Sequence, residues 1–149
     1  MKAKTRLFGE IDIDDGKIIK LVNGIIGFPE FKNFALIFDE EKKEGATIMW
    51  LQCMDEPEFA LPVIEPLKIM PDYNPTVEDD LLTPLGELNE ENTFVLITIT
   101  VPKDIKEMSV NLRAPFIINT DNNIGSQLII EDNLPVRYKI YDLLKKEGE

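Results

Sequence analysis

The stretch that decides the fold is NLRAPFIINTDNNIGSQ, residues 111–127. Its apolar positions predict two β-strands, residues 115–119 and 124–131, joined by a polar turn at 121–123. Amide side chains lower β-propensity, and they need hydrogen-bond partners when they are buried. Three such side chains are therefore expected either to hold corners of the fold by bonding to backbone or to contact a partner: Asn111, Asn119 and Gln127.

Short extended runs separated by turn signals continue on the N-terminal side of this stretch, which is typical of an antiparallel all-β sandwich or barrel. We expect Asp14-Asp15-Gly16 to turn one run back on the next as a hairpin, and Pro62 to confine its own strand to an edge or an end of the sheet. The runs lie at residues 5–13, 17–22, 34–38, 46–53, 58–64, 93–101 and 109–113.

The remaining segments add little regular structure. A short helix is expected near residues 76–86, with Thr76 as its N-cap and Pro84 and Gly86 ending it. The charged run 40–45 is expected to be a solvated hairpin tip, and the tail from about residue 142 is expected to be mobile. The sequence thus predicts one all-β, antiparallel, barrel-like or sandwich-like domain over residues 1–149.

The charge of the chain restricts its partners. With 28 acidic and 16 basic residues it carries a formal charge of −12. Such a field repels nucleic-acid phosphates and anionic membrane surfaces, so a direct RNA-binding barrel is disfavoured. It attracts basic proteins. The simpler alternative is that the acidity only keeps the protein soluble.

Residues that commonly carry catalysis are scarce. The chain has no histidine and a single cysteine, Cys53, which lies in an apolar run and is expected to be a core residue. The acidic run Asp12, Asp14 and Asp15 lacks the spacing of a calcium loop, so neither a metal nor another cofactor is expected. A small hydrolase or carbohydrate-binding domain that uses a pair of carboxylates stays open as an alternative.

The motif GIIGFPE at residues 24–30, followed by NLRAP at 111–115 with Ile118-Asn119 and Gln127, resembles the flagellar assembly factor FliW family. Further resemblances lie at Trp50-Leu51-Gln52 and Leu85-Gly86, and the likeness extends over about residues 5–140. The turn at 121–125 lacks the basic residues that many family members carry there.

The resemblance implies a non-catalytic cytoplasmic β protein whose partners are flagellin and the RNA-binding translational regulator CsrA. Family members held by flagellin leave CsrA free to repress flagellin translation, and members released when flagellin is secreted capture CsrA. The N-terminal stretch has no apolar signal-peptide core, which agrees with a cytoplasmic location. We expect a monomer whose acidic rim steers the basic regulator and lowers its affinity for RNA.

Seven residues are the candidates for partner contact. Phe28 and Phe59 are expected either to dock a flagellin helix or to pack in the core. Arg113 is expected either to pair with a carboxylate or to meet a partner. The full set is Phe28, Phe59, Asp72, Tyr73, Arg113, Asn119 and Gln127.

Overall fold

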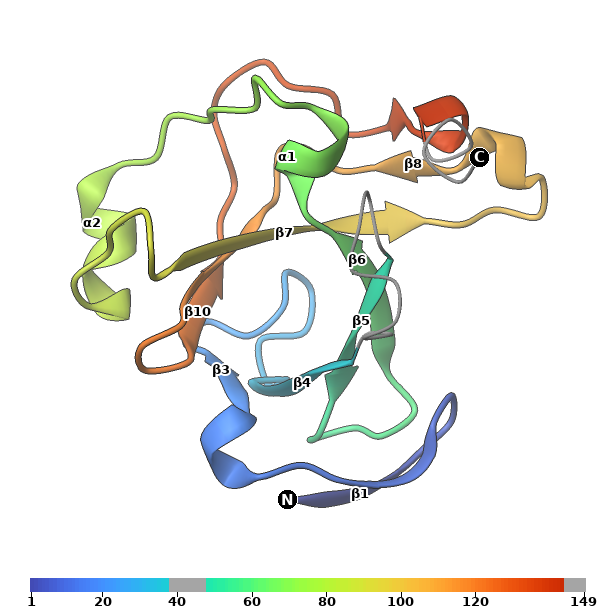
Figure 1. Cartoon of the computed structure of the whole chain (residues 1–149), viewed down its shortest axis with the longest axis vertical. Coiled ribbons are helices and arrows are strands. Elements are labelled where there is room, and N and C mark those ends of the chain that lie inside the picture. The colour runs from blue at the N-terminus through green and yellow to red at the C-terminus, as the bar shows by residue number, and fades with distance from the viewer. Residues whose placement is uncertain (38–47, 144–149) are drawn as a thin grey trace.

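A closed β-barrel forms the centre of the computed structural model, which describes residues 1–37 and 48–143. Seven strands close the barrel in the order β7-β6-β5-β4-β3-β10-β9, because β9 pairs with β7 as well as with β10. Figure 1 looks into this ring of strands. The barrel strands are β3 (Ile19–Leu21), β4 (Asn33–Ile37), β5 (Met49–Cys53), β6 (Ala60–Ile64), β7 (Thr93–Thr100), β9 (Phe116–Asn119) and β10 (Ile124–Gln127).

Smaller elements surround the barrel. The helices are α1 (Pro66–Ile69) and α2 (Asp79–Leu82), with 3-10 turns η1 (Asp15–Lys17), η2 (Thr83–Leu85) and η3 (Ile105–Glu107). Strands β8 (Ser109–Val110) and β11 (Tyr138–Lys139) extend the sheet beyond β7. Strands β1 (Lys2–Thr5) and β2 (Gly9–Asp12) form a separate hairpin. The all-β prediction is confirmed.

The alternation of apolar side chains explains how the strands are packed. Phe116 and Ile118 of β9 point into the barrel, while Ile117 between them packs on the outside beneath η2. All four residues of β9 are consequently buried. The barrel core also contains the lone thiol of Cys53, which is 0% exposed. This burial raises the pKa of the Cys53 thiol, in agreement with its expected core role.

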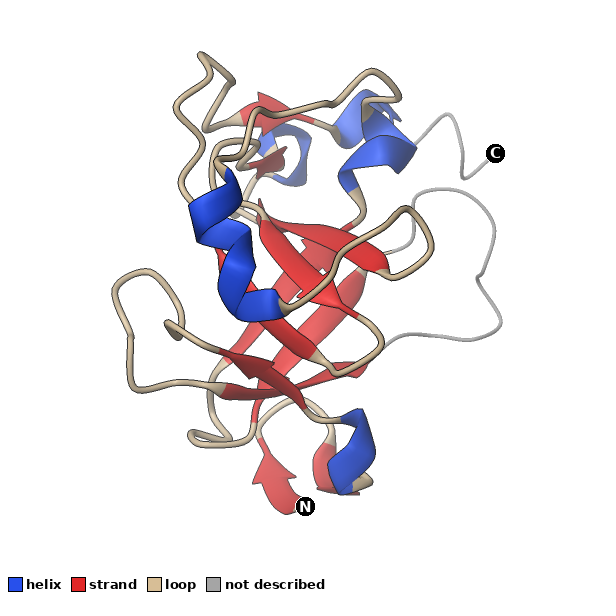
Figure 2. Cartoon of the chain, turned by 90° about the vertical axis from the view of Figure 1, so that its left-hand side faces the viewer, coloured by secondary structure: helices blue, strands red, loops and turns tan. Residues whose placement is uncertain are grey.

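Two further apolar clusters lie outside the barrel. One packs Ile69 of α1 and Tyr73 against β7 and β8, and it extends to Leu143, the last described residue. The other packs Leu85 of η2 over β9 and the segment after β10. Figure 2 shows α2 and η2 crossing the face of the strands on this side. The predicted helix near residues 76–86 is therefore present, divided into α2 and η2.

Several local expectations are wrong. The run 5–13 is not one strand, because Thr5 Oγ1 donates to the carbonyl of Gly9 and accepts from the N–H of Phe8, which turns the chain between β1 and β2. The run 17–22 does not pair back on it; β3 pairs with β4 instead. Strand β3 also pairs in parallel with β10, so the barrel is not purely antiparallel.

The proline and the helix cap also differ from expectation. Pro62 does not make β6 an edge strand, since β6 lies between β5 and β7. The pairing with β7 begins only at Val63, so the missing N–H of Pro62 costs no ladder bond there. Thr76 does not cap the helix, because its N–H donates to the carboxylate of Asp132 at 3.0 Å and Glu78 occupies the N-cap position.

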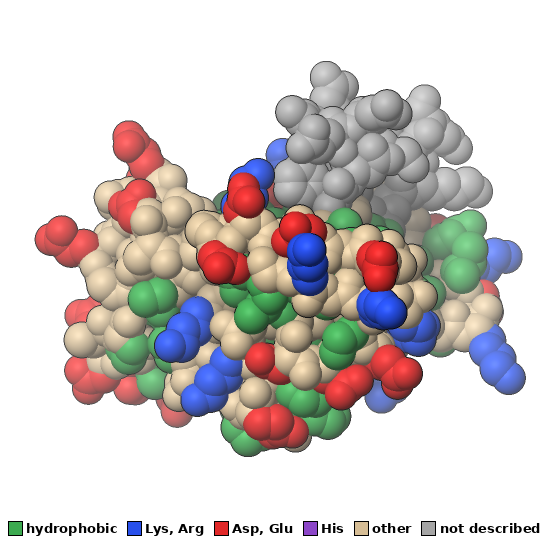
Figure 3. Space-filling model, turned by 90° about the horizontal axis from the view of Figure 1, so that it is seen from below, with side chains coloured by type: hydrophobic (Ala, Val, Ile, Leu, Met, Phe, Trp, Pro, Cys, Tyr) green, Lys and Arg blue, Asp and Glu red, His purple; other side chains and the backbone are tan. Residues whose placement is uncertain are grey.

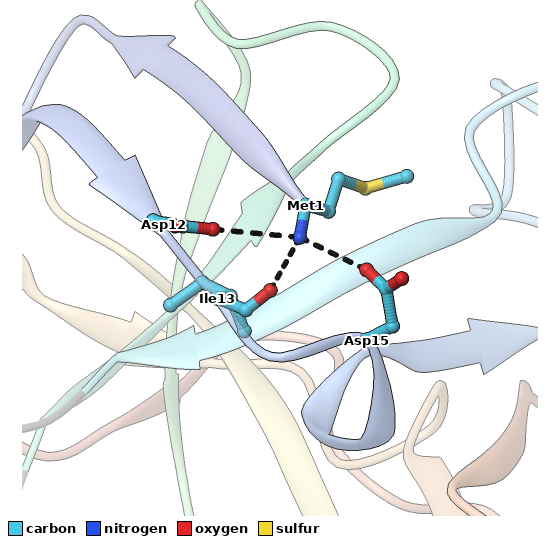
Figure 4. A network of polar contacts seen from close by, with 4 residues as sticks. All are labelled: Met1, Asp12, Ile13 and Asp15. Atoms are coloured by element: carbon cyan, nitrogen blue, oxygen red, sulfur yellow. Dashed lines mark hydrogen bonds and ion pairs between the residues drawn. The ribbon is translucent and has the colours of Figure 1, made fainter.

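The amine of Met1 closes the N-terminal hairpin (Figure 4). It donates to the carbonyl of Ile13 at 2.6 Å and to Asp15 at 2.9 Å, and it lies 3.6 Å from Asp12. The expected solvated tip at 40–45 and the end of the tail lie outside the described residues. None of the described helices is long and apolar enough to cross a membrane.

Candidate partner-binding surfaces

An exposed apolar surface is built on the loop between β3 and β4. We call Ile26, Phe28, Phe31 and Phe59 the aromatic patch. Ile26 is 49% exposed and Phe28 is 43% exposed, whereas Phe31 and Phe59 are half-buried against the barrel core. The Phe28 and Phe31 rings are stacked with centroids 5.3 Å apart, and Phe28 lies 5.4 Å from Phe59. Exposed apolar side chains that gather in this way mark protein contact sites.

The loop beneath this patch has a sharply defined backbone. Gly24 has a φ of +67°, and a Cβ at this position would lie 2.4 Å from the carbonyl oxygen of Pro29. Ile25 and Phe28 exchange backbone hydrogen bonds of 3.2 and 2.7 Å. Gly27 between them has a φ of +91°, as the third residue of a type II turn requires. The two glycines of the GIIGFPE motif therefore shape the patch.

The carboxylate of Asp55 fixes the end of the same loop. It accepts hydrogen bonds from the backbone N–H groups of Lys32 and Asn33, both at 2.8 Å, and from the side chain of Asn33 at 3.0 Å. Burial alone would raise the pKa of the Asp55 carboxyl, but these hydrogen bonds lower it below its ordinary value. Asp55 was not among the predicted residues, because an acidic residue after a strand has no distinctive sequence pattern.

A second surface is distinguished by its charge. Residues 69–102 and 114–136 contain ten carboxylates and no lysine or arginine, while the remainder of the chain holds 18 acidic and 16 basic residues. These two segments therefore account for −10 of the net −12. We call nine of the ten carboxylates the acidic face: Glu78, Asp79, Asp80, Glu87, Glu90, Glu91, Asp121, Glu131 and Asp132.

Hydrogen bonds bring the two acidic segments together in space. Asp121 accepts from the side chain of Asn92 at 3.0 Å, and Asp132 accepts from the N–H of Thr76. Eight of the nine carboxylate residues are exposed, Asp132 being half-buried, and none of the nine forms an ion pair within the part of the chain that the structure describes. A carboxylate that acts as a general acid or base lies within hydrogen-bond distance of its substrate. Carboxylates exposed in this way are instead suited to the long-range attraction of a basic surface.

The pictures agree with this charge distribution. Figure 1 places α2 and the turn before β10 on the left-hand side of the molecule. In Figure 3 the left-hand edge of the molecule carries acidic side chains and no basic ones, while acidic and basic side chains are mixed over the rest of that face. The sequence signal for this surface was the long interval without lysine or arginine between residues 69 and 102.

The predicted amides hold corners of the fold by bonding to backbone. Asn119 is 2% exposed, and its side chain donates to the carbonyls of Leu85 and Glu87 and accepts from the N–H of Asp121. Asn111 accepts from the N–H of Arg113 at 3.0 Å. The side chain of Asn119 is therefore enclosed and bonded to the backbone, and its contact with a partner stays a prediction.

The other predicted residues are divided between buried and exposed positions. Tyr73 is 7% exposed and donates to the carbonyl of Leu112 at 2.7 Å, so it too is enclosed, while the adjacent Asp72 is exposed. Burial raises the pKa of Tyr73 to about 12. Arg113 is half-buried, and no carboxylate of the described residues lies within ion-pair distance of it, so the expected ion pair is not found there.

Comparison with known proteins identifies the family. The sequence profile of the family described as FliW protein matches residues 2–140. This chain belongs to the FliW family. A flagellar assembly factor FliW from Lachnospira eligens is 47% identical over 149 residues, covering 99% of each chain. A FliW from Thermotoga neapolitana is 37% identical, covering 100% of this chain and 96% of its own.

A solved FliW structure has the same fold. A crystal structure of the flagellar assembly factor FliW superposes with a TM-score of 0.84 at 27% identity, covering 95% of this chain and 97% of the other. The resemblance noted in the sequence is therefore confirmed at the level of the family, together with the all-β fold. The protein is accordingly a flagellar assembly factor of the FliW family, with a role in flagellum biogenesis.

Proposed function

We propose that this FliW-family protein is a non-catalytic, cytoplasmic regulator that binds flagellin and a CsrA-type translational regulator in turn. When flagellin occupies the protein, the regulator is free to repress flagellin translation. When flagellin has been exported, the protein captures the regulator and relieves repression. It acts as a monomer, and it does not bind RNA itself because its net charge of −12 opposes phosphate binding.

The observation that carries this proposal is the segregation of charge. Nine carboxylates of the acidic face have no basic residue among them in either of the two segments that supply them. An RNA-binding protein needs a positive surface to hold phosphates. A negative surface of this size attracts that same positive surface, accelerates encounter and opposes the approach of RNA. The acidic face therefore supports capture of the regulator.

The aromatic patch supports the contact with flagellin. Ile26 and Phe28 project an apolar surface of the kind that receives the apolar face of an amphipathic helix. Phe59 lies behind Phe28 and against the core, so it would support the patch rather than form its tip. Asp72 and Arg113 remain candidate contacts at other points of the surface.

A competition experiment tests the proposed switch. The regulator is bound to a labelled flagellin-mRNA leader, and the purified protein is added with and without flagellin. We expect the protein to displace the RNA, and an excess of flagellin to restore the RNA complex. The proposal would be contradicted if the RNA complex were unaffected, or if the protein itself shifted the RNA at moderate salt.

A further inference from the structure

We infer that Gln127 is a positioning residue that holds the aromatic patch in the conformation that binds flagellin, without touching flagellin itself. This inference rests on the proposed function, in which flagellin contacts the patch. Gln127 lies on β10, 101 residues from Ile26 in the sequence. Its amide oxygen accepts the N–H of Ile26 at 2.8 Å, and its amide nitrogen donates to the carbonyl of Ala114 at 3.3 Å.

The turn that carries Ile26 bonds mainly within its own loop. Ile25 and Phe28 bond to one another, Gly24 donates to Leu21, and Phe31 donates to Phe28. These bonds shape the loop, and the one to Leu21 joins its start to β3, the strand from which the loop leaves. Among the hydrogen bonds of residues 24–28 in the described structure, the one to Gln127 is the one that reaches a strand other than β3, namely β10. It therefore fixes the tip of the loop relative to the barrel.

With its second hydrogen bond, Gln127 acts as an acceptor and a donor at the same time. The N–H of Ile26 requires an acceptor and the carbonyl of Ala114 requires a donor. Of three side chains of similar size, the amide supplies both at once, whereas a carboxylate supplies the acceptor alone and leucine supplies neither. This difference allows a graded test with side chains of similar size.

Fixing the tip of the loop changes affinity by a predictable amount. If the loop leaves the binding conformation for part of the time, the apparent affinity falls in proportion to the competent fraction. The net contribution of one hydrogen bond corresponds to roughly a two- to tenfold change in such an equilibrium. We therefore expect Gln127→Leu to weaken flagellin binding by roughly two- to tenfold.

The experiment compares Gln127→Leu with Gln127→Glu, and with Asn122→Leu as a matched control. Asn122 belongs to the same hairpin, but its side chain donates to Leu85 and accepts the N–H of Ile124, and neither of these residues belongs to the aromatic patch. Three quantities are measured for each protein: affinity for purified flagellin monomer, affinity for the CsrA-type regulator, and exchange of the Ile26 amide by NMR. We expect Gln127→Leu to lose affinity for flagellin and protection of Ile26, with its affinity for the regulator unchanged.

The remaining variants complete the test. Gln127→Glu keeps the acceptor for Ile26, so it should preserve the protection of that amide and most of the affinity for flagellin. The inference is overturned if Gln127→Leu binds flagellin as the wild type does, or if it loses both partners together with thermal stability. If the wild type binds no flagellin, the proposed function fails, whereas unchanged exchange of Ile26 in Gln127→Leu overturns the positioning role itself.

Discussion

The side chain of Asn119, at the end of β9, donates a hydrogen bond of 2.8 Å to the carbonyl oxygen of Leu85. The two residues are 34 positions apart in the sequence, and both are buried. This bond ties η2, which follows the acidic helix α2, to the barrel. Asn119 thus holds the segment that follows α2 against the end of β9.

Replacing Asn119 by alanine should destabilise the protein. The change removes bonds to the carbonyls of Leu85 and Glu87 and leaves the N–H of Asp121 without its acceptor. We expect the free energy of unfolding to fall by about 2 kcal/mol in a urea titration. Asn122→Ala, which removes a part-buried bond to Leu85 and the acceptor of the Ile124 N–H, should cost less, about 1 kcal/mol, because Asn122 itself is exposed. Equal losses in the two variants would contradict this account of Asn119.

Two glycine substitutions in the loop between β3 and β4 should distinguish backbone strain from steric clash. Gly24→Ala places a methyl group 2.4 Å from the carbonyl oxygen of Pro29 and also strains a positive φ. We expect a loss of at least about 3 kcal/mol in the free energy of unfolding. Gly27→Ala has a positive φ but open space around the new methyl group, so it should cost only about 1 kcal/mol. A thermal scan that ranked the two in the opposite order would show that Gly24 is not the crowded position.

The hydroxyl of Tyr73 should lose its proton only at high pH. Its pKa is raised from 10.0 to about 12 by burial and, to a smaller extent, by the charge of Asp132. Since the folded state holds this proton more tightly, the stability that the hydroxyl contributes is complete below pH 10 and is lost as the pH rises towards 12. Absorbance of tyrosinate should show a step near pH 12 that is missing in Tyr73→Phe. A Tyr73 step at pH 10 would contradict its burial.

The thiol of Cys53 should be unreactive in the folded protein. It is fully buried in the barrel core, and its sulfur accepts the N–H of Glu56 at 3.4 Å. We expect labelling by a thiol reagent to follow global unfolding, so that the rate rises with urea in step with the unfolded fraction. Rapid labelling without denaturant would place Cys53 near the surface and would disagree with the core of the barrel.

The sequence was sufficient for features that depend on local pattern. The alternating residues of 93–101 predicted β7, and the turn at 121–123 predicted the hairpin of β9 and β10. The amides at 111, 119 and 127 were expected to bond to backbone or to a partner, and the structure shows backbone bonds for all three. Such residues stand out because a strand does not otherwise need them.

Features that depend on tertiary pairing could not be predicted in this way. Nothing local indicates that β3 pairs in parallel with β10, about a hundred residues later, or that β9 returns to β7 and closes the barrel. Pro62 suggested an edge because the sequence does not show where the ladder with β7 starts. The burial of Tyr73 and Asn119 likewise follows from segments that pack over them, so their exposure could not be inferred from neighbouring residues.

The salt dependence of binding tests most directly whether the acidic face captures the basic regulator. The affinity for a CsrA-type regulator is measured from low to high salt for three proteins. They are the wild type, a variant of the acidic face (Asp80→Asn, Glu90→Gln, Glu91→Gln) and a control with the same change of charge elsewhere (Glu10→Gln, Asp14→Asn, Asp142→Asn).

We predict that wild-type affinity falls steadily as salt is raised, because exposed charges are screened. At low salt the acidic-face variant should bind about tenfold more weakly and depend less on salt, while the control behaves as the wild type does. An affinity that is the same at all salt concentrations, or an equal loss in the variant and the control, would contradict the claim.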